Sequence, residues 1–168
     1  MRKRVWGNEY RNTRVCIDSY EQTNPAGRIY HAALPQGQSF HSLTQFFVCM
    51  DRLLDEVNIP QSFTTARSFA GPHEAGGPNL LELGERPNGE LATFMVRVLF
   101  RQNASWQGSV TWLEGEQEES FRSALELAFL MDSALTMTLD ERAAPDREQT
   151  VLFEATGPGG SDDEGVKA

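Results

Sequence analysis

Hydrophobic residues recur with helical spacing in two stretches of the chain. The first follows Ser39, and its apolar positions lie three and four residues apart, which is the pattern of a helix with one buried face. These positions are Phe40, Leu43, Phe46, Phe47, Met50, Leu53, Leu54 and Val57. Ser39 is a residue type that caps helices, and Pro60 is one that ends them. The second helix is predicted to start near Ser120 and to run to about Thr138.

Strand-like stretches precede both helices. They are rich in β-branched and aromatic residues, which favour extended structure. The expected strands are residues 14–20, 28–34, 91–102 and 109–115. Residues 21–27 contain Asn, Pro and Gly, and residues 103–108 contain Asn and Gly, so both segments are predicted to be turns.

The two helical stretches are also similar in sequence. SFHSLTQFFVCMDRLL (39–54) and SFRSALELAFLMDSAL (120–135) match without a gap at six positions. Ordinary composition gives about one identity by chance over such a window. The same offset of 81 residues places Gly27 on Gly108, outside the helices. These matches predict an internal duplication.

The pattern predicts an α+β protein made of two ββα units. The units are residues 14–58 and 91–138, and they are joined by a long Gly- and Pro-rich loop, residues 59–90. One such unit cannot cover both its helix and its sheet, whereas two units can share one core. We therefore expect a single domain over residues 14–138, with a four-stranded antiparallel sheet and two helices on one face.

Charge is unevenly distributed along the chain. The net charge is −9, yet residues 1–14 carry five basic residues and one acidic residue, and residues 140–168 carry eight acidic and three basic. We therefore expect a basic N-terminal arm, residues 1–13, and an acidic, largely disordered tail, residues 139–168. The overall charge argues against bulk attraction to nucleic acid or to an anionic membrane.

Targeting and redox signals are weak. No apolar run has the length of a transmembrane helix or of a signal-peptide core, and the two cysteines show no metal or redox spacing. The sequence therefore predicts a reduced, cytoplasmic protein that does not enter a membrane.

Candidate catalytic chemistry is sparse. The three histidines and two cysteines have no ligand spacing, and the phosphate-loop, GxSxG and HExxH patterns are absent. We therefore expect no metal, no cofactor and no enzymatic activity. Asp51 and Asp132 occupy matching helix positions, and a solvated carboxylate or a local capping role is favoured over catalysis for both.

The face of the sheet that the helices leave open is the predicted binding surface. Strand alternation points Val15, Ile17, Ile29, Phe94, Val96, Val98, Phe100, Val110 and Trp112 toward the helices. The candidate binding residues on the opposite face are Tyr20, Arg28, Tyr30, Arg97, Leu99 and Arg101. Arg and Tyr are favoured at interaction surfaces because they combine large contact area with hydrogen bonding.

Two functions are compatible with this face. The first is a protein-interaction or regulatory module that uses the face for a partner or for self-association. The alternative is nucleic-acid or nucleotide binding, in which tyrosines stack bases and the arginines of the face and the basic arm hold phosphates. In the competing structural interpretation, the loop or the arm folds over the face.

Trp106 is unusual because it lies in a predicted turn. Two interpretations remain open: the ring folds back onto the sheet, or it is a contact residue for a partner. Folding back is favoured, since an isolated exposed Trp forgoes burial worth about 1.5–3 kcal/mol.

Residues 100–135 resemble segments of a family of small, uncharacterised bacterial proteins. The most specific part is RQNASWQGSVTW followed by SFRSALEL. The resemblance implies a bacterial, cytoplasmic origin. It implies no activity, so no functional residue is transferred from it.

Overall fold

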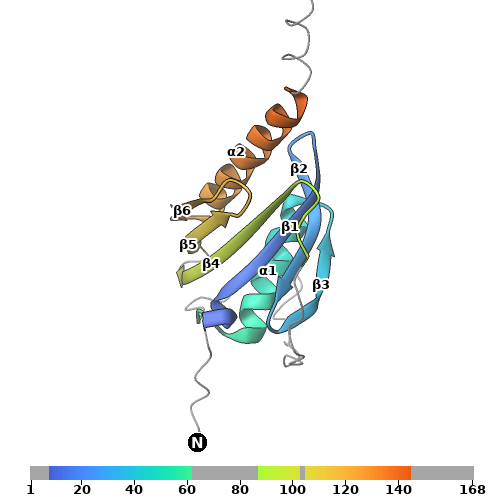
Figure 1. Ribbon diagram of the computed structural model, residues 1–168. Helices are drawn as coiled ribbons and strands as arrows, with labels where there is room; N and C mark the ends of the chain where they lie inside the picture. The colour runs from blue at the N-terminus through green and yellow to red at the C-terminus, as the bar shows by residue number, and fades with distance from the viewer. Residues whose placement is uncertain (1–7, 62–86, 103–104, 145–168) are drawn as a thin grey trace, which may run out of the picture.

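The computed structural model describes residues 8–61, 87–102 and 105–144, which form a six-stranded antiparallel sheet and two α-helices. The first half consists of a 3-10 helix η1 (Asn8–Arg11), β1 (Asn12–Glu21), β2 (Asn24–His31), β3 (Leu34–Phe40) and α1 (Leu43–Val57). The second half consists of β4 (Ala92–Gln102), β5 (Ser105–Trp112), β6 (Gln117–Phe121) and α2 (Ala124–Ala143). The strand order is β3-β2-β1-β4-β5-β6 (Figure 1).

The predicted α+β class is confirmed, but the prediction of four strands is wrong. Each unit contains a third strand, β3 or β6, that forms an outer edge of the sheet. Strand β3 was not predicted because Pro35 and Gly37 are poor strand formers. Strand β6 was not predicted because it is mostly polar. Both features are tolerated at an edge, where one row of backbone groups faces away from the sheet.

The two units match element by element at the predicted offset of 81 residues. Asn24 and Ser105 begin β2 and β5, and Leu43 and Ala124 begin the two helices. At the centre of the sheet, β1 pairs with β4 in antiparallel orientation. The repeated unit is therefore βββα, and a pseudo-two-fold axis between β1 and β4 relates the two copies.

One β-bulge occurs at the same place in both units. The β1–β2 register shifts between Ile17 and Ser19, and the β4–β5 register shifts between Val98 and Phe100. A bulge puts two residues opposite one and bends the strand. The matched glycines lie beside it: a Cβ added at Gly27 would overlap the carbonyl oxygen of Cys16, and one at Gly108 that of Arg97. Both positions therefore require glycine for a steric reason, which explains why the two units match here.

The bulge also reverses the alternation of side chains after it. Tyr20 and Arg101 therefore lie on the helix side of the sheet, where each bonds a helix carboxylate. Phe100 lies on the open side and is 55% exposed. The predicted faces of these three residues are wrong because the prediction assumed uninterrupted strands.

The helices begin three residues later than predicted, at caps that also match. Ser42 and Ser123 accept hydrogen bonds of 3.1 Å at Oγ from the backbone N–H of Gln45 and Glu126, respectively. The side chains of Gln45 and Glu126 in turn accept from the backbone N–H of the residue before each cap. Both caps are therefore reciprocal, as in a capping box, but the N–H that reaches the third helical residue belongs to the residue before the cap.

Two predicted turns were misplaced. In the first hairpin the turn residues are Gln22 and Thr23, both left-handed with φ of 50° and 62°, so β2 already begins at Asn24. Pro25 is tolerated there because β3 pairs with β2 only from Gly27 onward. In the second hairpin β5 begins at Ser105, which places Trp106 in a strand.

The core is one continuous cluster between the sheet and the two helices, which lie on the same side of the sheet (Figure 1). Its largest fully buried side chains include Phe40, Phe46, Phe94, Phe121, Met50 and Met131. The helix α2 continues to Ala143, beyond its expected end. In the described part of the chain, neither helix is long and apolar enough to cross a membrane. Most of the predicted arm, loop and tail lies outside the described residues.

Candidate functional site

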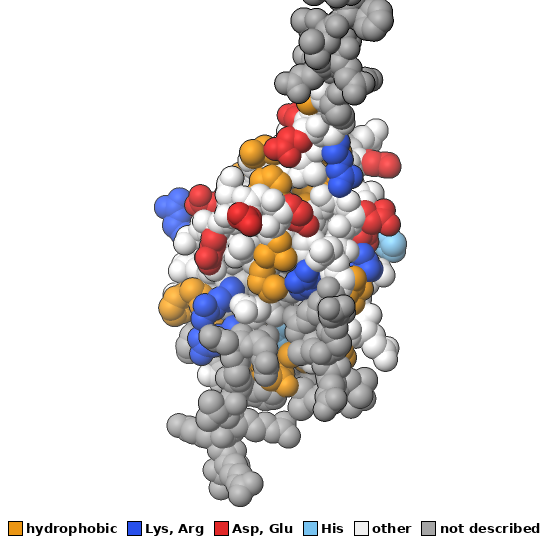
Figure 2. All heavy atoms as spheres, viewed as in Figure 1, with side chains coloured by type: hydrophobic (Ala, Val, Ile, Leu, Met, Phe, Trp, Pro, Cys, Tyr) orange, Lys and Arg blue, Asp and Glu red, His pale blue; other side chains and the backbone are white. Residues whose placement is uncertain are grey.

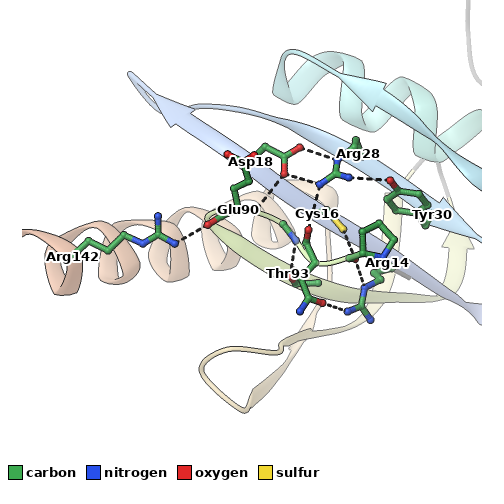
Figure 3. Close-up of polar contacts among 11 residues, drawn as sticks. Arg14, Cys16, Asp18, Arg28, Tyr30, Glu90, Thr93 and Arg142 are labelled. Atoms are coloured by element: carbon green, nitrogen blue, oxygen red, sulfur yellow. Dashed lines mark hydrogen bonds and ion pairs between the residues drawn. The ribbon is translucent and has the colours of Figure 1, made fainter. Parts of the chain in front are cut away.

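The half of the open face that belongs to the first unit holds a polar network (Figure 3). Arg28 donates to both carboxylate oxygens of Asp18, at 2.9 and 2.8 Å, and to the hydroxyl of Tyr30 at 3.1 Å. Burial pushes the pKa of Asp18 up, but the hydrogen bonds from Arg28 and from the backbone of Glu90 outweigh it. The pKa of Asp18 is therefore lowered, and the carboxylate stays ionised.

A segment that we call the crossing segment, residues 87–91, runs over this network before it enters β4. The carbonyl oxygen of Pro87 accepts from Arg14 Nε at 3.0 Å and from the Cys16 thiol at 3.2 Å. Arg14 also donates to the side-chain oxygen of Asn88. The crossing segment thus satisfies polar side chains that strand β1 presents on the open face.

The rest of the crossing segment is held on both sides. The backbone N–H of Glu90 donates to Asp18 at 3.2 Å, and the carbonyl of Glu90 accepts from Arg142 of α2 at 2.7 Å. Arg28 donates to the carbonyl of Asn88 at 3.3 Å. The polar groups of the first half of the open face are therefore bonded within the chain (Figure 3).

The buried thiols are poor candidates for chemistry. Burial is the largest influence on Cys16 and raises its pKa in spite of the nearby arginines. Burial also raises the pKa of Cys49. The thiolate is the reactive form, so both cysteines are expected to be unreactive at neutral pH.

The second half of the open face is different, and we call it the β4 patch: Met95, Arg97, Leu99 and Phe100. Leu99 is 38% exposed and Phe100 is 55% exposed, and they are adjacent because the bulge turns both toward the open side. Arg97 Nε is buried and has no hydrogen-bond partner among the described residues. In Figure 2, hydrophobic side chains reach the surface over the end of β4 at the lower left.

The matched positions of the two units make the contrast explicit. At the offset of 81, Leu99 corresponds to Asp18 and Phe100 corresponds to Ser19. Asp18 is bonded to Arg28, whereas the residue that corresponds to Arg28 is Ser109, which cannot form an ion pair. The bulge that presents an internally paired carboxylate in the first unit presents two apolar side chains in the second.

The predicted site residues are thus divided between two faces. Arg28, Tyr30, Arg97 and Leu99 lie on the open face, and the first two are part of the bonded network. Tyr20 and Arg101 lie on the helix side and are not added to the candidate surface. Their binding role stays an untested prediction.

Tyr20 and Arg101 instead link the two units. The hydroxyl of Tyr20, in the first unit, donates to Asp132 in α2. Arg101, at the matched position in the second unit, donates to Asp51 of α1 at 2.9 Å and to Asp55 at 2.6 Å. Asp51 and Asp132 match in the sequence, but strand alternation placed Tyr20 and Arg101 on the wrong face, so these cross-unit contacts were not predicted.

Trp106 is buried, with 5% of its surface exposed. Its ring packs edge-on against Phe47 of α1, with ring centroids 5.5 Å apart. This placement agrees with the favoured interpretation that the ring folds back, here onto the helix side of the sheet. Phe47 belongs to the first unit, so this contact is a third link between the units.

The described residues offer no group of three or more His, Cys, Asp or Glu side chains that would hold a metal ion. Comparisons of the chain with protein-family models, with curated proteins and with solved structures give no match.

Proposed function

We propose that the chain is a non-enzymatic protein-interaction module whose β4 patch binds a segment of a partner protein. One observation carries the proposal: Leu99 and Phe100 are exposed side by side next to Arg97, whose Nε lacks an acceptor among the described residues. Adjacent exposed apolar side chains on a sheet are a feature of interaction surfaces.

The chemistry of the patch indicates what the partner presents. Arg97 is partly exposed and has no ion-pair partner among the described residues, and a carboxylate is the acceptor that suits arginine best. The apolar side chains of Leu99 and Phe100 favour an apolar side chain beside that carboxylate. The proposed ligand is therefore a peptide segment with an Asp or Glu next to an aliphatic or aromatic residue.

Nucleic-acid binding receives less support from the same face. Arg28 is neutralised by Asp18, and Arg14 is engaged by Pro87 and Asn88. Arg101 lies on the other side of the sheet. Arg97 and Arg101 each have one buried donor without a partner among the described residues, but only Arg97 lies on the open face. Residues 2–4 of the basic arm lie outside the described part.

The experiment is selection of peptides from a displayed random library by the whole chain. Selected peptides are then measured by fluorescence anisotropy against wild type, Phe100→Ser, Arg97→Gln and the control Ser19→Ala, which changes the position that corresponds to Phe100. We expect enrichment of acidic-apolar peptides. Phe100→Ser and Arg97→Gln should each weaken binding about 10-fold or more, and Ser19→Ala should leave it unchanged.

Three results would count against the proposal. They are a library that yields no enriched sequence, peptides that bind both patch variants as well as wild type, and peptides that Ser19→Ala weakens as strongly. A parallel titration with single-stranded oligonucleotides tests the alternative. Binding that weakens steeply with salt and requires Arg97 would assign the face to nucleic acid instead.

A further inference from the structure

The outward side of α2 is apolar, which is unusual for a helix at a protein surface. Its inward side buries Leu127, Met131, Ala134 and Leu135. On the opposite side Leu125 and Phe129 are each 63% exposed, and Met137 is 44% exposed. A helix that is apolar on two sides has a second packing surface.

The matched helix α1 serves as an internal reference. The positions that correspond to Leu125, Phe129, Ser133 and Met137 are Thr44, Val48, Arg52 and Glu56. Helix α1 therefore combines the same buried side with a mostly polar outward side, as a solvent-facing helix does. The fold itself does not require an apolar outward side in this position of the repeat, so the apolar side of α2 needs another explanation.

The outward residues of α2 form one ridge that is complementary to itself. Leu125, Phe129, Ser133 and Met137 are spaced by four, which is the ridge that packs into grooves of a second helix. Reversal of the helix about Met131 places Leu125 opposite Met137, and Phe129 opposite Ser133. The ridge contains no charged side chain, so it can be buried against a copy of itself without an unpaired charge.

Charged side chains of both signs lie at each end of α2: Arg122 and Glu126 at its start, and Asp140, Glu141 and Arg142 at its end. Arg122 precedes the helix and its side chain is 86% exposed, in an ion pair with Glu126. Asp140 and Glu141 are exposed at the other end. The same antiparallel register brings Arg122 toward Asp140 of the partner copy. Antiparallel helices also align their macrodipoles favourably.

We infer that α2 is a self-association helix. Two copies of this chain form a two-fold symmetric dimer in which the outward sides of their α2 helices pack antiparallel, and the two-fold axis passes at the level of Met131 along the helix. This inference goes beyond the proposed function, because it uses the opposite side of the molecule from the β4 patch and a different occupant. An isologous contact buries each side chain twice, so the four-residue ridge contributes eight side chains to the interface.

Salt distinguishes the two surfaces. Each copy carries a net charge of −9, so two copies repel each other at low ionic strength, and salt screens that repulsion. The α2 contact is mainly apolar, and dimerisation should therefore strengthen with salt. Binding of an acidic peptide to Arg97 should weaken with salt, so failure of one proposal is distinguishable from failure of the other.

The test is sedimentation velocity of the full chain over a range of concentrations, with wild type, Phe129→Glu and Val48→Glu. Val48 is the position in α1 that corresponds to Phe129, and it is 43% exposed. We expect a wild-type dimer, a dissociation constant raised by about 100-fold or more for Phe129→Glu, and no change for Val48→Glu. Circular dichroism of each variant reports whether it is folded.

Cross-linking tests the register, and it does so even if Phe129→Glu does not fold. Cys16 and Cys49 are buried, so a cysteine placed by Ser133→Cys is the exposed thiol among the described residues. The antiparallel register about Met131 puts the two copies of this cysteine near the axis, and oxidation should produce a covalent dimer. Leu139→Cys lies away from the axis and should not form one.

Several outcomes would overturn the inference. The first is a wild-type chain that remains monomeric up to millimolar concentration in high salt. The second is a dimer that Val48→Glu weakens as much as Phe129→Glu does. The third is a dimer that Phe100→Ser dissociates and Phe129→Glu does not, which would move self-association to the β4 patch.

Discussion

The two βββα units share their skeleton and differ in their surfaces. Both have the bulge, the glycine beside it and the reciprocal serine cap of the helix at matched positions. Yet the first unit bonds its open-face polar groups internally and has a mostly polar outward helix side, whereas the second exposes Leu99, Phe100, Leu125 and Phe129. The contrast separates what folding requires from what it leaves free, because the first unit shows that the fold tolerates polar residues at those positions.

Contacts between the two units can be separated from contacts within each unit. Tyr20 and Arg101 occupy the same position in β1 and β4, and each bonds the carboxylate at the matched position in the other unit's helix. The chemistry differs, since one contact is a phenol to one carboxylate and the other is a guanidinium to two. The two contacts between the units, Tyr20 with Asp132 and Arg101 with Asp51 and Asp55, are thus placed symmetrically, but they are expected to differ in how much they stabilise the fold.

The largest effect is expected where the units are most alike. Gly27→Ala and Gly108→Ala each place a Cβ against a backbone carbonyl beside the bulge, which cannot move away as a side chain can. Each should lower the free energy of unfolding by about 2–4 kcal/mol, measured by urea denaturation. A loss confined to one of the two variants would show that the bulges are not equivalent.

The next largest effect concerns the difference in stabilisation between the Arg101 contact and the Tyr20 contact. Arg101 has a 6% exposed side chain, and its removal leaves Asp51 and Asp55 near each other without their cation. The two carboxylates are 36% and 51% exposed, so water moderates the loss. Arg101→Met should cost about 2 kcal/mol and Tyr20→Phe about 1 kcal/mol. Equal losses in urea denaturation would contradict the proposed inequality.

The smallest effect is a pH dependence at the Tyr20 contact. Burial and the hydrogen bond and charge of Asp132 raise the pKa of Tyr20 from 10.0 to about 12. The unfolded chain therefore releases this proton at lower pH than the folded chain does, so stability from this group is full below pH 10 and is lost as pH rises toward 12. Between those values wild type should lose more stability than Tyr20→Phe. Parallel curves for the two proteins would exclude this role.

The sequence was sufficient for those features that rest on regular periodicity. The helical spacing and the repeat at an offset of 81 predicted two helices on one face and a pairing of two similar units. It was insufficient for β3 and β6, because edge strands need few apolar residues and tolerate Pro and Gly. The first helix was predicted to start three residues too early, because Ser39 and Ser42 are equally good caps when each is considered alone.

The candidate site was predicted only in part, and one residue in each strand explains the difference. Asp18 and Leu99 are the extra residues of the two bulges, and every side chain after them changes face. Strand alternation alone therefore assigned Tyr20 and Arg101 to the open face and Phe100 to the core. Gly27 and Gly108 were the available signal, because an isolated glycine inside a strand often marks a bulge.

The central pairing of β1 with β4 has a consequence for the order of folding. Every other strand pair in the described sheet joins neighbours along the chain, whereas Ile17 pairs with Ala92 and Asn12 with Arg97. Those partners meet only after a long loop closes, and the entropy of closure must be met before their contacts contribute. Each unit can form its own hairpins and helix from local contacts, so we expect the pairing of β1 with β4 to limit how fast the whole sheet is completed.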